Sequence, residues 1–116
     1  IFKGLLKSFS PVYFNLNSLK GDAFLKKKVN ACVELLRRFP KYKIVLTGHT
    51  CDLGKPESNM QLSMRRALVL KNELVIRGIS ESRIITKWVG DNEPVAPNDT
   101  EGNRSKNRSV TWEVAD

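Results

Sequence analysis

Histidine and cysteine are the side chains of this chain most suited to covalent chemistry, and one pair of them lies close together. His49 and Cys51 stand two apart on an extended segment, so their side chains point to the same side. A cysteine nucleophile beside a histidine base is one arrangement for covalent catalysis. His49 is the only histidine, however, and no third residue stands nearby to orient it. We therefore expect a hydrogen-bonded His49 at a strand end, a small semi-buried Cys51, and no enzyme activity.

The same residues do not supply a cofactor site. One histidine with Cys32 and Cys51 falls short of a zinc ligand set, and the glycines form no phosphate-binding loop. The sequence therefore predicts no metal and no organic cofactor. The two cysteines are also predicted to stay unbonded. Their positions along a helix and an extended segment differ by about 13 Å, beyond the ~7 Å Cα limit for a disulfide.

Composition indicates one folded domain with a basic surface. The chain has 116 residues, of which 41% are hydrophobic and 28% charged, and its net charge is +8. Such a charge attracts nucleic acid, anionic lipid or an acidic polymer. A nucleic-acid binder would need an aromatic stacking platform, whereas Trp112, Phe14 and Phe24 stand at positions expected for a core. No apolar run is long enough for a membrane span, so we expect membrane association only through regions outside this chain.

The apolar spacing predicts alternating strands and helices that would position these residues. The predicted elements are a strand at 12–16, a helix from 21 to 39, a strand at 43–47, a helix from 56 to 78, a strand at 83–89, a loop at 91–103 and a strand at 110–114. Right-handed crossovers place both helices on one face of the sheet. We therefore expect an α/β (α+β) two-layer sandwich of order β-α-β-α-β-loop-β on a mixed four-stranded sheet. It forms one domain over 1–116, with a core at about 11–115 and a leader at 1–10.

Three ordered motifs span most of the chain. They are GHT at 48–50, N-x-x-L-S-x-x-R-A at 59–67 and N-R-x-V at 107–110. With Gly78, Gly90 and Glu101 they resemble the OmpA-like peptidoglycan-binding domain, which also occurs in peptidoglycan-associated lipoproteins and flagellar stator proteins. The resemblance covers about 11–114. It implies a non-catalytic domain that grips the peptide stem of peptidoglycan in the periplasm, as part of an outer-membrane protein or lipoprotein.

The resemblance also implies a set of site residues. In that family the arginine of the second motif, here Arg66, contacts the carboxylate of the stem diamino acid, and an aspartate directly after GHT contacts its ammonium. Arginine suits a carboxylate because its fork of donors binds both oxygens. It follows that Arg66→Ala is expected to abolish wall binding and leave the fold intact. The full set of expected ligand-binding residues is Arg66, Asp52, Cys51, Thr50, Asn59, Asn107 and Arg108.

Several of these residues have a structural alternative. Asn59 is also suited to the turn that begins the second helix. Thr50 is suited to satisfying loop backbone, and Arg108 to a strand edge or to bracing the site loop.

The chain departs from the family pattern where the ammonium is held. Cys51 stands at the expected aspartate position and Asp52 follows it, while Asn15 and Ser109 replace a first-strand aspartate and a second arginine. Three outcomes remain open: Asp52 takes over the contact, the ligand differs, or the site no longer binds. The alternative function is a scaffold module with a decayed wall site that serves protein–protein assembly in the envelope.

Overall fold

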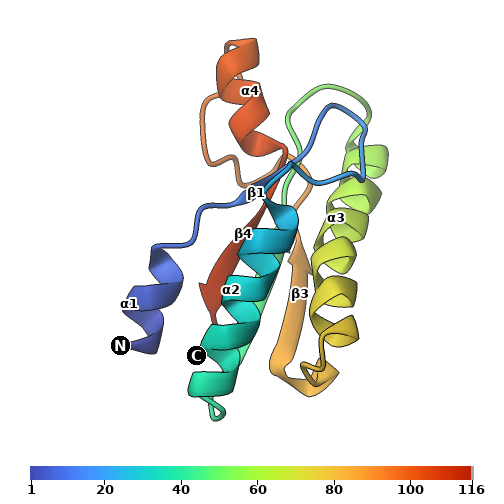
Figure 1. The fold of residues 1–116 in the computed structure, drawn as a ribbon. Coiled ribbons are helices and arrows are strands. Elements are labelled where there is room, and N and C mark those ends of the chain that lie inside the picture. Colours follow the sequence, from blue (N-terminus) through green and yellow to red (C-terminus); the bar gives the residue numbers. More distant parts are fainter. Residues whose placement is uncertain (116) are drawn as a thin grey trace.

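A mixed four-stranded sheet forms the centre of the computed structural model, which describes residues 1–115. The strands are β1 (Val12–Tyr13), β2 (Ile44–Gly48), β3 (Ile84–Trp88) and β4 (Ser109–Val114), in the spatial order β1-β4-β2-β3. β2 and β3 are parallel, whereas β4 is antiparallel to both β1 and β2 (Figure 1). The predicted topology is confirmed, and it brings the ends of β2 and β3 together near the start of β4.

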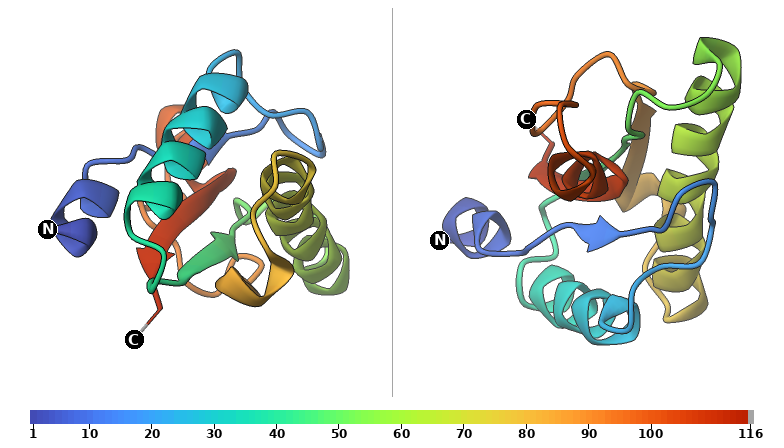
Figure 2. Two further views of the ribbon diagram at one scale, coloured as in Figure 1. Left: turned by 60° about the horizontal axis from the view of Figure 1, so that its bottom comes forward. Right: turned by 90° about the horizontal axis from the view of Figure 1, so that it is seen from above.

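Two long helices cover one face of this sheet, as predicted. α2 (Leu25–Arg38) turns a stripe of apolar residues inward, including Val29, Val33 and Leu36. α3 (Pro56–Ile76) begins at a proline, which lacks the N–H that a first helical turn leaves unpaired. It is followed by Gly78 at φ +96°, a conformation that favours glycine. Figure 2 shows the two helices side by side against the sheet.

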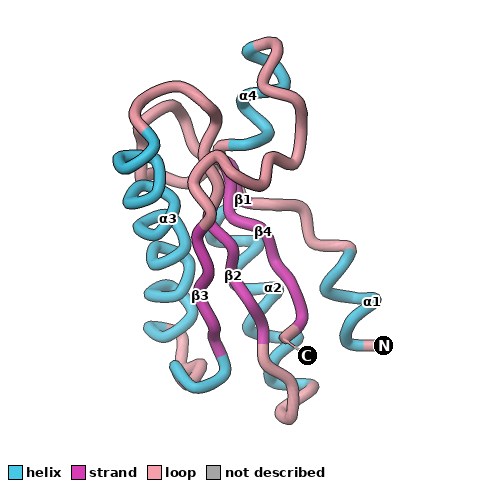
Figure 3. Tube along the Cα trace, turned by 180° about the vertical axis from the view of Figure 1, so that it is seen from behind, coloured by secondary structure: helices cyan, strands magenta, loops and turns pink. Residues whose placement is uncertain are grey.

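The opposite face of the sheet carries no helix among the described residues. Figure 3 shows β2, β3 and β4 with nothing packed in front of them. This face is polar along the middle of the sheet, where Thr47 accompanies Thr111 and Glu113, and Thr47 donates to Glu113. Among the helices within 1–115, none combines the length and apolarity that crossing a lipid bilayer requires.

The first strand and the leader segment differ from the sequence prediction. β1 has only two residues because the chain turns at once, with Ser18 donating to the Asn15 carbonyl and Asn17 at φ 57°. Residues 1–10, expected to be a leader segment outside the core, contain α1 (Phe2–Lys7). Its Phe2 and Leu6 lie four apart on one side of the helix and join the core.

Two further short helices were also absent from the prediction. α4 (Glu101–Asn107) occupies the end of what was predicted to be a loop, and η1 (Glu81–Arg83) is a 3₁₀ turn before β3. α4 has no apolar stripe, so periodicity could not reveal it. Its start is capped by Thr100, whose side chain accepts from the Asn103 amide at 3.1 Å. α4 projects from the end of the molecule opposite to the N-terminus (Figure 1).

One predicted core aromatic is not in the core. Trp112 and Phe14 are buried as expected, but Phe24 is 60% exposed. It directly precedes α2, at a turn in which its amide is held by the Asp22 carboxylate at 2.8 Å. This turn leaves the ring outside the buried stripe of the helix.

Candidate functional site

The end of β2 lies against α3 at a place that requires glycine. A Cβ at Gly48 would collide with the Ser63 main-chain carbonyl of α3. The Ser63 hydroxyl also accepts a 3.0 Å hydrogen bond from the amide of Gly90, which follows β3. The close approach fixes the position of the segment that follows Gly48, which holds most of the predicted site residues.

His49 faces the open side of the sheet and takes no part in a nucleophilic pair. Its ring contacts the Glu93 carbonyl through Nδ1 at 3.2 Å and the Thr111 hydroxyl through Nε2 at 3.1 Å. Burial lowers the pKa of the ring, partly opposed by the bond to Glu93 and the nearby carboxylates. No hydrogen bond joins His49 to Cys51 within residues 1–115. The prediction of a hydrogen-bonded histidine at a strand end is confirmed.

Asn59 holds the loop that contains Cys51 and Asp52. Its amide group donates to the Leu53 carbonyl at 3.1 Å and the Cys51 carbonyl at 3.4 Å, and the residue is buried. No side chain caps the start of α3, so Asn59 does not serve the helix terminus. Thr50 is also buried, and its hydroxyl has no hydrogen-bond partner among the described residues. Thr50 and Cys51 thus have fixed positions set by Asn59 and the end of β2.

Arg66 is completely buried, and each of its three nitrogens donates one hydrogen bond to a main-chain carbonyl. Nε donates to Ser18 at 3.1 Å, Nη1 to His49 at 3.0 Å and Nη2 to Asn15 at 3.0 Å. The guanidinium also lies 5.2 Å from the centre of the Phe14 ring. Burial lowers the pKa of Arg66 to about 10, so the group stays charged at neutral pH. Arg66 therefore places a positive charge in the site and joins three segments of the chain.

Arg108 lies beside Cys51 and is held by an acid from α4. Its Nη2 donates to Glu101 at 2.6 Å, its Nε to the Phe14 carbonyl at 3.3 Å, and its Nη1 to the Cys51 sulfur at 3.8 Å. The bond to Glu101 raises the pKa of Arg108, and the same bond lowers the pKa of the Glu101 carboxyl. Arg108 therefore braces the site, which is one of the two roles that the sequence left open.

The two remaining predicted residues hold neighbouring segments. Asp52 is 40% exposed at its side chain and accepts from Arg104 Nε of α4 at 2.9 Å. Asn107 is fully buried and forms hydrogen bonds with the 94–98 loop. Its side-chain oxygen accepts from the Val95 and Ala96 amides at 2.8 and 3.0 Å. Asn107 has no donor or acceptor left for a ligand, whereas Asp52 is held only by a half-exposed partner.

Five of the seven predicted residues surround one narrow cavity. Thr50, Cys51, Asn59, Arg66 and Arg108 line it, and it has no room for a water molecule. Beside it lies an open cleft of about 840 Å³ between the 13–23 segment and α4, and Arg108 lines both spaces. Two guanidinium groups and no carboxylate line the narrow cavity, so it places positive charge beside the open cleft.

Several residues around the site were not predicted. The carbonyls of Asn15 and Ser18 hold Arg66, and the Phe14 ring lies over it. Arg104 pairs with Asp52. Every residue has a main-chain carbonyl, so the sequence cannot indicate which carbonyls bind Arg66. The ion pair between Arg104 and Asp52 could not be predicted either, because it depends on how α4 packs. Glu101 was part of the motif set, but its partner Arg108 lies seven residues away and is reached only through the helix.

Comparison with known proteins identifies the family. The sequence model of the OmpA family matches residues 13–108. A peptidoglycan-associated lipoprotein of Buchnera aphidicola subsp. Baizongia pistaciae is 33% identical over 103 residues, covering 89% of this chain and 60% of that protein. Outer membrane porin F of Pseudomonas fluorescens is 37% identical over 86 residues, covering 74% of this chain and 26% of the porin. This chain therefore spans only part of the length of these relatives.

Solved structures share the fold. The peptidoglycan-associated lipoprotein from Burkholderia pseudomallei superposes with a TM-score of 0.86 at 23% identity, covering 91% of this chain and 90% of that one. The C-terminal domain of Helicobacter pylori MotB gives a TM-score of 0.83 at 25% identity, covering 91% and 84%. The matched family model extends from the end of β1 to Arg108 and so includes every predicted site residue. This chain belongs to the OmpA family.

Proposed function

We propose that this chain is a single OmpA-like domain that binds peptidoglycan without covalent chemistry and tethers an envelope protein to the cell wall in the periplasm. The observation that carries the proposal is the meeting of two arginines at one site. Arg66 and Arg108 line the same cavity, and Arg108 also lines the cleft of about 840 Å³ beside it. A relative that matches 89% of this chain is a peptidoglycan-associated lipoprotein, and this supports peptidoglycan as the ligand of this chain.

The open cleft is suited to the carboxylates of a stem peptide. Lys20, Lys106 and Arg108 line it, and Asp22 is the one acid among its lining residues. A charge-assisted bond from arginine or lysine to a carboxylate is shorter and stronger than a neutral hydrogen bond. We infer that Arg108 makes the direct contact, since it borders the cleft. Arg66 then acts through its charge and by holding the Asn15 and Ser18 carbonyls in place.

The ammonium of a diamino acid needs an acceptor, and we infer that Asp52 serves, since Asp22 of the cleft is already bound by Lys28 and the Tyr13 amide. Cys51 is neutral and buried, so it offers no charge. Asp52 is bound to Arg104 in a half-exposed pair, and such pairs contribute at most about 1 kcal/mol. An ammonium can therefore replace Arg104 at modest cost. The proposal is that Asp52 exchanges Arg104 for the ligand.

A second candidate function is a scaffold domain that no longer binds the wall. The specific observation in its favour is that each nitrogen of the buried Arg66 guanidinium already donates to a main-chain carbonyl, while a thiol occupies the place beside Arg108. If no exchange at Asp52 takes place, the site presents two arginines without the acid that an ammonium requires.

Co-sedimentation with purified peptidoglycan, followed by titration with a diamino-acid stem peptide, separates the two functions. We expect the chain to sediment with the wall and to bind the free peptide. Asp52→Asn should weaken peptide binding about tenfold, because it removes a charged acceptor. Asp99→Asn, which neutralises an exposed acid just before α4, is the matched control and should change nothing. Absence of sedimentation and of peptide binding in the parent chain would establish the scaffold function.

A further inference from the structure

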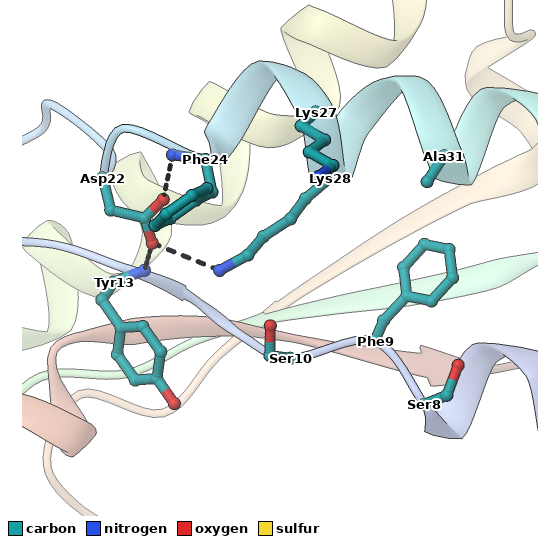
Figure 4. A pocket seen from close by; sticks show the side chains of 9 residues that line it. All are labelled: Ser8, Phe9, Ser10, Tyr13, Asp22, Phe24, Lys27, Lys28 and Ala31. Atoms are coloured by element: carbon teal, nitrogen blue, oxygen red, sulfur yellow. Dashed lines mark hydrogen bonds and ion pairs between the residues drawn. The ribbon is translucent and has the colours of Figure 1, made fainter.

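A second hollow, away from the arginine site, lies between residues 8–13 and residues 22–31. We call it the α2 groove; its volume is about 660 Å³. Figure 4 shows Lys28 reaching from α2 toward β1, and Phe9 rising from the preceding segment toward Ala31. Phe24 stands at one end and is 60% exposed. The groove therefore offers the rings of Phe24 and Phe9 and the small side chain of Ala31 to solvent.

The main chain beside the groove is closed to strand addition. β1 is an edge strand, and an edge strand normally offers unpaired N–H and C=O groups to another chain. Here the Tyr13 amide donates to the Asp22 carboxylate at 2.9 Å, and the Pro11 carbonyl accepts from Lys28 Nζ at 2.7 Å. An occupant of the groove must therefore be recognised by its side chains.

The charge around the groove is strongly one-sided. The two segments that build it, residues 8–13 and 22–31, contain three lysines and a single acid, Asp22. That acid is already bound to Lys28 at 3.3 Å. Lys27 is exposed at the groove and forms no ion pair within residues 1–115. The free positive charge favours an occupant that carries carboxylates.

The shape of the groove indicates a peptide more than a lipid surface. A membrane-binding face needs apolar side chains that protrude together into the bilayer. Within the groove Phe24 is exposed, whereas Phe9 is half-buried against the Trp112 ring, so the apolar side chains of the lining do not protrude together. A concave site with aromatic walls and a charged rim is typical of the pockets that hold an anchor side chain of a protein partner.

From these features we propose that the α2 groove docks a segment of a protein partner in which an aromatic or branched apolar side chain stands beside glutamate or aspartate. The apolar side chain packs on Phe9, Phe24 and Ala31, and the carboxylate pairs with Lys27. The groove and the arginine cleft share only Tyr13 and Asp22, which together form the ridge between them. A partner in the groove therefore leaves the cleft that Arg108 lines open to the cell wall.

The test uses the complete chain and a short synthetic peptide that alternates glutamate with phenylalanine and leucine, with blocked ends and a fluorescent label. Binding is measured by anisotropy at physiological salt, and the site is located by NMR shifts of backbone amides. We expect shifts in residues 8–13 and 22–31. Lys27→Glu and Phe24→Ser should each weaken binding about tenfold. Both side chains are exposed, so both variants should keep the parent melting temperature and the parent sedimentation with peptidoglycan.

The matched control is Lys41→Glu, which makes the same charge change at an exposed residue beyond the other end of α2. It should alter peptide affinity less than about twofold. Equal weakening by Lys27→Glu and Lys41→Glu would mean unspecific attraction by net charge and would overturn the proposal. NMR shifts confined to the Arg108 cleft would also overturn it, and so would equal binding of a peptide in which glutamine replaces glutamate. A chain that does not bind the peptide but is captured by vesicles of anionic lipid would overturn it as well. Because the groove variants keep wall binding, either proposal can fail without the other.

Discussion

Arg66 of α3 and His49 at the end of β2 are joined by a 3.0 Å hydrogen bond from Nη1 to the main-chain carbonyl. The other donors of the same guanidinium hold the carbonyls of Asn15 and Ser18. One buried side chain thus fixes the helix, the central strand and the loop after β1 relative to each other. The most characteristic charged residue of the site is also part of the framework that shapes it.

Replacing Arg66 should therefore destabilise the whole domain. Arg66→Ala leaves the buried His49 carbonyl and the partly buried Asn15 and Ser18 carbonyls without their donor, and a buried group left so costs about 1–3 kcal/mol, so a loss of at least about 1 kcal/mol is expected. Urea denaturation measures it. This outcome replaces the expectation from the sequence that the variant keeps its fold. The neighbouring exposed Arg65 is the control, and Arg65→Ala should stay within about 0.5 kcal/mol of the parent. A parent-like midpoint for Arg66→Ala would contradict the structural role.

Introducing an acid at Cys51 should improve recognition of a diamino acid. The thiol accepts from Arg108 at 3.8 Å, so Cys51→Asp puts a carboxylate beside that guanidinium and returns an acceptor to the cavity. The gain should be modest, about fivefold in affinity for a stem peptide, because position 51 is 1% exposed and the ammonium has to approach the new carboxylate from the neighbouring cleft. Calorimetric titration measures it, with Cys51→Asn as the neutral control. The gain should vanish for a peptide whose third residue lacks the side-chain amine. An unchanged affinity would indicate that Asp52 already holds the ammonium.

The two thiols should be free and slow to react in the folded chain. Cys32 lies on the buried side of α2, where burial raises its pKa to about 12, and Cys51 is 1% exposed. The thiolate is the reactive form, so a thiol reagent at neutral pH should label the native protein slowly. Unfolding in denaturant without reductant should release two reactive thiols per chain. A monomer with none would show that the predicted separation of the cysteines is wrong.

Acidification below about pH 6.5 should lower stability through the single histidine. Burial holds the pKa of His49 below its ordinary value, so the unfolded chain binds a proton that the folded chain resists. The stabilisation is complete above the unfolded pKa and is lost as the pH falls toward the folded pKa. Melting temperatures recorded between pH 7.5 and 5.5 should fall in the parent. The fall should be smaller in His49→Gln, because glutamine does not titrate. Equal slopes in the two proteins would assign the effect to other groups.

The sequence alone determined the two long helices, the three longer strands and the family. These follow from local patterns: the apolar stripe of α2, the β-branched run of β2, and Pro56 and Gly78 at the ends of α3. Right-handed connection then leaves few ways to arrange the elements. The site could be predicted as a set of residues because three motifs stand in a fixed order along the chain.

Tertiary structure alone decided what each site residue does. Arg66 turned out to be bound by three main-chain carbonyls, Asn107 by a loop, and Asp52 by Arg104. The helix α4 and the exposed ring of Phe24 were decided in the same way. The physical reason is common to all of them. Hydrogen bonds and ion pairs between distant segments depend on how the elements pack, whereas apolar periodicity records only which side of an element faces inward.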